Sequence, residues 1–154
     1  MLLELFVPEA TRAVALALDA DSIPVRRTET ADGWIESDWF DAATLRPTSA
    51  RRLGPDVVKV RAFVNPDKPN FSVVTLETVY RPVADPSRDD RLLEQQVPAT
   101  HPVSIRMAAL VNRLTMEFGE PLPQPDSTLQ ADTTSGLVPR RPPVPAPEPK
   151  KKPS

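Results

Sequence analysis

The sequence predicts an α+β fold: a two-layer sandwich with two helices packed on one face of an antiparallel sheet of about four to five strands. Several short segments alternate apolar and polar residues, as half-buried strands do. Two longer segments, one near each end of the predicted folded part, repeat apolar residues every three or four positions, as amphipathic helices do. The predicted order of elements is therefore β-α-β-β-β-β-α.

The folded domain is expected at residues 1–119, followed by a disordered proline-rich tail at residues 120–154. Ten of the 20 prolines lie in the tail, which contains no aromatic residue. Such a segment cannot bury enough apolar surface to offset the entropy lost on ordering. Its stretch "RRPPVPAPEP" has the P-x-x-P spacing of a polyproline II ligand, and a stiff spacer has the same composition.

The first strand is expected at residues 2–7, "LLELFV", where apolar residues occupy both alternating faces. A helix then follows, because Pro8 suits a first helical turn and Glu9 suits the positive end of a helix. The segment "EATRAVALALDADS" repeats apolar residues at helical spacing and is rich in alanine. Pro24 is expected to end this helix.

The next two strands are expected within residues 25–40, "VRRTETADGWIESDWF", on either side of Asp32 and Gly33. An Asp-Gly pair is a strong hairpin signal, since both residues accept a positive φ. A single long strand with a glycine bulge is the competing interpretation.

A polar connection leads to the last two strands, "DVVKVRAFVN" (56–65) and "FSVVTLETVYR" (71–81), which the turn "NPDKPN" joins into an antiparallel hairpin. A second connection leads to the closing helix, "THPVSIRMAALVNRLTMEFG" (100–119), for which Thr100 is the candidate N-terminal cap. Its apolar positions form a helical stripe: Val103, Met107, Leu110, Val111, Leu114 and Phe118.

A candidate binding patch lies in "GWIESDWF", residues 33–40. Strand alternation places Ile35, Ser37 and Trp39 on one face. If Ile35 and Trp39 face the helices, the open face carries the candidate patch: Trp34, Glu36, Asp38 and Phe40. Such a patch would bind a protein or a glycan, and a solvated strand face is the ordinary alternative. Glycosidase chemistry at its two acids would also need a cleft, which a small flat sheet lacks.

A candidate pocket for a lipid or another hydrophobic ligand lies between the closing helix and the sheet. Its expected lining is part of the helical stripe: Met107, Leu110, Leu114 and Phe118. The ordinary alternative is that these four side chains belong to the core.

Composition excludes several classes of function. The chain has no cysteine, one histidine (His101) and four glycines. Thiolate metal sites, a cysteine nucleophile and glycine-rich phosphate loops are therefore excluded, and we expect no cofactor, no metal site and no catalytic residues. A net charge of −2 without a basic stripe argues against nucleic-acid binding. No apolar run approaches the roughly 20 residues that span a bilayer, and "MLLELFV" lacks the features of a signal peptide.

The segment Gly33–Trp39, the hairpin around residues 57–81 and the helix opening "HPVSIRMAALVNRL" together resemble BamC-like outer-membrane-assembly lipoprotein domains. The resemblance implies a helix-on-sheet fold and a non-enzymatic accessory subunit held at the outer membrane by a lipidated cysteine. Because this chain has no cysteine, peripheral membrane association would require an upstream lipidation signal. The protein would then be periplasmic or associated with the outer membrane, and otherwise cytoplasmic.

We therefore expect a non-catalytic domain that binds a protein partner, such as a membrane complex of the bacterial cell envelope. The alternative is a binding protein for a lipid or hydrophobic ligand.

Overall fold

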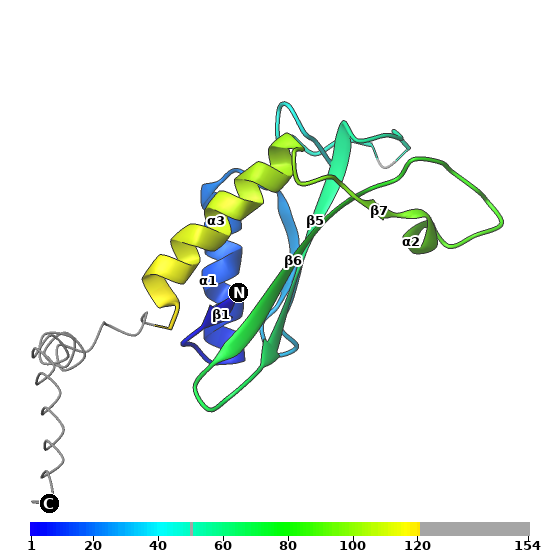
Figure 1. Cartoon of the computed structure of the whole chain (residues 1–154). Helices are drawn as coiled ribbons and strands as arrows, with labels where there is room; N and C mark the ends of the chain where they lie inside the picture. The colour runs from blue at the N-terminus through cyan, green and yellow to red at the C-terminus, as the bar shows by residue number, and fades with distance from the viewer. Residues whose placement is uncertain (50, 121–154) are drawn as a thin grey trace, which may run out of the picture. The chain divides into compact units, whose positions relative to one another are not determined.

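The computed structural model describes residues 1–49 and 51–120, which form a mixed α+β structure with an open antiparallel sheet, consistent with the predicted two-layer sandwich (Figure 1). The predicted proline-rich tail lies outside the described residues. The helices are α1 (Val7–Ala20), α2 (Asp90–Leu93) and α3 (Pro102–Phe118). The strands are β1 (Leu2–Leu3), β2 (Val25–Glu29), β3 (Trp34–Ser37), β4 (Phe40–Asp41), β5 (Val57–Pro66), β6 (Ser72–Tyr80) and β7 (Gln95–Gln96).

The sheet is built around the long hairpin of β5 and β6. Its main path runs β1-β6-β5-β3-β2, while β4 pairs with β5 and β7 pairs with β6, all antiparallel. Figure 1 shows α1 and α3 together on one side of this hairpin. We call the sheet face under these helices the inner face and the opposite one the outer face.

The core lies between the inner face and the two long helices. On β5, alternate residues from Val58 to Val64 are at most 2 % exposed, as the strand period requires. Each fully buried aliphatic side chain contributes about 1.5–3 kcal/mol. The helices contribute Ala10, Val14, Leu18, Val103, Met107, Leu110 and Leu114.

The hairpin of β2 and β3 confirms the turn interpretation of the Asp-Gly pair. Gly33 has a φ of +67°, and the Val64 amide donates to its carbonyl at 2.7 Å. A Cβ at this position would lie 2.1 Å from the Val64 carbonyl oxygen. Glycine is therefore required both by the turn and by the close approach of β5. The sheet irregularity that does occur lies between Val25 and Arg27 on β2.

The first predicted strand is much shorter than expected. β1 contains only Leu2 and Leu3, because Phe6 is already the N-cap of α1. The Phe6 amide donates to the Glu9 carboxylate at 3.4 Å, so the acid expected to favour the helix start contacts the backbone there. The connection after β6, expected to be a loop, also contains the short elements α2 and β7, and β4 begins at the last residue of the predicted strand segment 25–40.

The closing helix begins as expected but with a different cap. His101, rather than Thr100, is the N-cap, and its Nδ1 accepts a hydrogen bond from the Val103 amide at 3.2 Å. Because Nδ1 accepts, the proton sits on Nε2, which donates to the Pro55 carbonyl at 2.7 Å. The single histidine therefore joins the start of α3 to the segment before β5.

We expect His101→Ala to lower the free energy of unfolding by about 1–2 kcal/mol, because it removes the cap and the bond to Pro55. Urea denaturation followed by tryptophan fluorescence measures this change. His101→Asn can still cap the helix and should lose less than half as much. An asparagine variant as unstable as the alanine variant would show that the cap contributes little.

Candidate functional site

The predicted patch begins on β3 as strand alternation requires. Trp34 and Glu36 lie on the outer face, where they pair with Phe63 and Arg61 of β5. Ile35, on the inner face, has no exposed surface. This part of the patch therefore lies where the sequence places it.

The second half of the patch departs from the prediction. Phe40 is fully buried in the core, and Trp39 lies half-buried on the outer face, so the predicted faces of these two residues are wrong. The reason is that β3 ends at Ser37 and β4 begins only at Phe40. Asp38 and Trp39 between them belong to no strand, so the alternation does not continue from β3 into β4.

The outer face carries a partly buried ionic network rather than free acids. Lys59 Nζ donates to Glu36 Oε1 at 3.0 Å, and Arg61 Nε donates to Glu36 Oε2 at 3.3 Å. Arg61 also donates through both terminal nitrogens to the Glu94 carboxylate, which follows α2. Lys59 and Arg61 are 8 % and 6 % exposed. The connection that contains α2 thus covers this part of the sheet.

The network fixes the ionisation of its groups. Burial raises the pKa of Glu36, but hydrogen bonds and charges from Lys59, and then Arg61, outweigh burial and leave this pKa below its ordinary value. The hydrogen bond to Glu94 is the main reason that the pKa of Arg61 is raised. A carboxylate held ionised between two cations is a poor proton donor, so this geometry does not favour Glu36 as a general acid.

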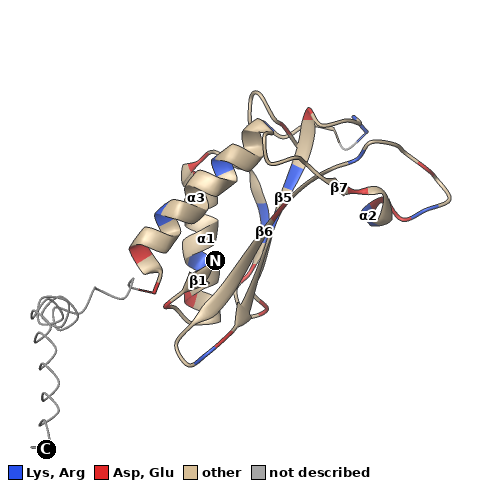
Figure 2. Ribbon diagram, viewed as in Figure 1, with Lys and Arg blue, Asp and Glu red and all other residues tan. Residues whose placement is uncertain are grey.

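Both tryptophans carry a cation over the ring. Arg27 lies 4.9 Å from the centre of the Trp34 ring. Trp39 contacts two cations, with Lys59 Nζ at 5.0 Å and the guanidinium carbon of Arg81 at 4.7 Å from its ring centre. Figure 2 shows basic residues on β5 and charges of both signs around α2. The Trp34 ring of the predicted patch is thus already contacted by a cation from within the domain.

Asp38 lies apart from this network. Its carboxylate is 41 % exposed and reaches Arg26 at 4.0 Å, at the limit of an ion pair. A pair this long and exposed contributes little to stability.

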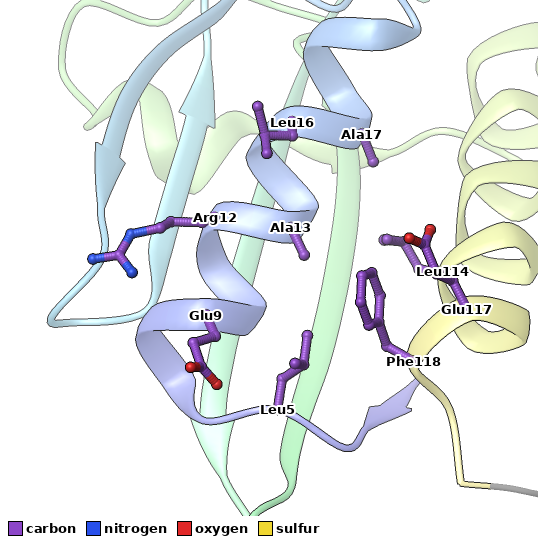
Figure 3. Close-up of a pocket in the computed structure, with 9 residues that line it drawn as sticks. All are labelled: Leu5, Glu9, Arg12, Ala13, Leu16, Ala17, Leu114, Glu117 and Phe118. Carbon is purple, nitrogen blue, oxygen red and sulfur yellow. The ribbon is translucent and has the colours of Figure 1, made fainter.

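The four residues of the candidate pocket are divided between the core and two hollows. Met107, Leu110 and Leu114 are at most 5 % exposed and belong to the core. Leu114 and Phe118 also line an open groove of about 470 Å³ between α1 and α3 (Figure 3). Met107 lines a smaller recess of about 250 Å³ beside β6 and β7. The larger of these two hollows is therefore lined by the last two residues of the predicted pocket, and it lies between α1 and α3 rather than between α3 and the sheet.

The groove between α1 and α3, here called the helical groove, is mainly apolar. Figure 3 shows side chains of both helices and of the segment before α1 directed into it. Leu16 lies at its edge and is 70 % exposed. The apolar lining consists of Leu5, Ala13, Leu16, Ala17, Leu114 and Phe118, and the charged lining of Glu9, Arg12 and Glu117.

The sequence predicts part of the α1 side of this groove. The predicted stripe of α1 runs through Ala10, Val14, Ala17 and Leu18, with Ala13 beside it. Ala10, Val14 and Leu18 are buried, whereas Ala13 and Ala17 line the groove. Leu16 falls outside that stripe, and a large apolar residue on the polar side of a helix is the available signal.

The described residues contain few of the groups that would identify a chemical activity. Within residues 1–49 and 51–120, no three metal-binding side chains gather closely enough to hold an ion, and no helix is long and apolar enough to cross a membrane. The single histidine is engaged at the start of α3. No family model, no curated protein and no solved structure matches this chain.

Proposed function

We propose that this chain is a non-catalytic protein-interaction domain whose helical groove receives an amphipathic helix of a partner protein. The observation that carries the proposal is the open apolar groove with Leu16 70 % exposed at its edge. Contiguous apolar surface of this kind marks interaction sites more often than isolated exposed residues do. A groove that receives the apolar face of a helix is a recurrent mode of recognition.

The lining favours a helix with basic residues beside its apolar face. Ala13 and Ala17 lie one turn apart on α1, and their small side chains permit close approach of a third helix. The charged lining has two acids, Glu9 and Glu117, against one base, Arg12. This balance complements a basic partner and disfavours the surface of an anionic membrane.

The cellular context of the proposal is an accessory subunit of a bacterial cell-envelope assembly. It rests on the resemblance of Gly33–Trp39, the β5–β6 hairpin and α3 to BamC-like domains. A second candidate function is binding of a hydrophobic ligand such as an acyl chain in the same groove. The groove volume of about 470 Å³ supports it, since small-molecule sites measure about 300–1,000 Å³.

Site-specific photo-crosslinking in cells tests the proposal. A photoreactive residue at position 16 should give one protein adduct, and adding Ala17→Glu should abolish it by filling the groove with charge. Position 116 is the control, because Met116 is 88 % exposed on α3 but does not line the groove. Equal adducts from both positions, or none from position 16, would contradict the proposal. A lipid retained in native mass spectrometry and lost with Ala17→Glu would favour the second candidate.

Once the crosslinked partner is identified, we expect Leu16→Asp to weaken its binding by about 10- to 30-fold, because a charge replaces a large apolar side chain of the interface. Met116→Asp introduces the same charge outside the groove and should leave the affinity within about twofold. Isothermal titration calorimetry of the purified pair measures both values. Because both side chains are exposed, neither change should unfold the domain.

A further inference from the structure

Arg81, directly after β6, is a buried arginine with only part of its guanidinium engaged. The residue is 6 % exposed. Its Nη1 donates to Asp90 Oδ2 at 3.0 Å. Its Nε and Nη2 are buried and donate to no atom of the structure's described part. A buried donor without an acceptor costs about 1–3 kcal/mol, and more when it is charged.

The two unused donors belong to one edge of the guanidinium. The N–H bonds of Nε and Nη2 point the same way from that edge, at the spacing of two oxygens of a carboxylate or phosphate. Arg61, on the outer face, is a useful comparison: its Nε bonds to Glu36 and both terminal nitrogens bond to Glu94. Each nitrogen of Arg61 therefore has an acceptor, whereas the Nε/Nη2 edge of Arg81 has none among the described residues.

The charge around this edge is incompletely balanced. Arg81 and Lys59 both lie over the ring of Trp39. Lys59 is paired with Glu36, whose carboxylate is largely buried with it. The partner of Arg81, Asp90, is 68 % exposed, so solvent screens most of its attraction.

We propose that the Nε/Nη2 edge of Arg81 is a binding site for an oxyanion, either a carboxylate or a phosphate. Two parallel charge-assisted hydrogen bonds hold the ligand, and the Trp39 ring fixes the orientation of the guanidinium. Both edge nitrogens are shielded from solvent, so the ligand enters on a local opening. α2 has no buried residue, so a local opening of α2 that leaves the Arg61–Glu94 pair intact exposes little apolar surface.

Nuclear magnetic resonance of the arginine Nε–Hε groups tests the site directly. Acetate and inorganic phosphate are titrated separately at constant ionic strength into the ¹⁵N-labelled protein. We expect a saturable shift of the Arg81 signal with at least one anion, and the anion that acts distinguishes the two ligand classes. The Arg61 signal should not move, because its Nε already donates to Glu36. Absence of a saturable Arg81 shift with both anions would overturn the proposal.

Two variants exclude a general effect of anions. Because Arg81 lies over the Trp39 ring, anion binding should also shift the Trp39 indole signal of the unmodified protein. Arg81→Lys keeps the charge but removes the edge, so this shift should disappear. Asp90→Asn removes a neighbouring negative charge and should tighten anion binding about two- to fivefold, the size of a surface ion pair. An unchanged response of Trp39 in Arg81→Lys would equally overturn the proposal. Circular dichroism without added anion establishes that each variant is folded.

Discussion

Replacing Phe40 by alanine is expected to lower the free energy of unfolding by about 3–5 kcal/mol. Phe40 has no exposed surface and is among the largest fully buried side chains of the domain. It lies on β4, which pairs with β5 at Val57 and Val58. Removing its ring takes apolar contacts away and leaves a cavity that this short strand cannot close. Urea denaturation followed by circular dichroism measures the loss.

Phe63→Ala is the matched control for this prediction. It deletes the same ring from β5, but on the outer face, where Phe63 is only half-buried. We expect it to cost about 1–2 kcal/mol, in proportion to the smaller area removed from water. Equal losses of unfolding free energy for the two variants would place Phe40 outside the core, on the open face where strand alternation predicted it.

The sequence predicts the face of Trp34 correctly and the face of Phe40 wrongly, and the difference shows where strand alternation stops being informative. Alternation correctly assigned Trp34 and Ile35, because both lie within one regular strand. It failed beyond Ser37, where the chain leaves β3 for two residues before β4. Alternation with a period of two predicts the faces of residues only while the strand continues, and no glycine or proline marks the break at Asp38 and Trp39.

The long elements were predictable because they depend on local sequence patterns, whereas the contacts between them join residues far apart in the chain. The hairpin of β5 and β6 and the two long helices follow from local periodicity and turn residues. The helical groove depends on how α1 packs against α3, about 100 positions later in the chain. The pairing of Arg61 with Glu94 likewise spans 33 residues. Neither arrangement leaves a periodic signal in one sequence.

The second large effect is expected at Glu94. We expect Glu94→Gln to lower the free energy of unfolding by about 2–3 kcal/mol at neutral pH, because it leaves the buried guanidinium of Arg61 with Glu36 as its remaining carboxylate. The side chains of Arg61 and Glu94 are each 8 % exposed, so water compensates little. Asp85→Asn is the control on the same connection. Its ion pair with Arg88 joins two exposed side chains, so its loss should cost less than about 0.5 kcal/mol.

A double-mutant cycle separates the interaction free energy of Arg61 and Glu94 from the destabilisation caused by leaving one of them unpaired. Glu94→Met leaves the buried Arg61 without this carboxylate, and Arg61→Met leaves the buried Glu94 without its cation. The double variant removes both charges. We expect the double variant to be more stable than the sum of the single losses predicts, by about 2 kcal/mol. Glu36 also accepts a hydrogen bond from Lys59 at 3.0 Å, so it keeps one cationic partner when Arg61 is replaced. Strictly additive losses would show that Glu94 and Arg61 act independently, and that the connection containing α2 is held on the sheet by other contacts.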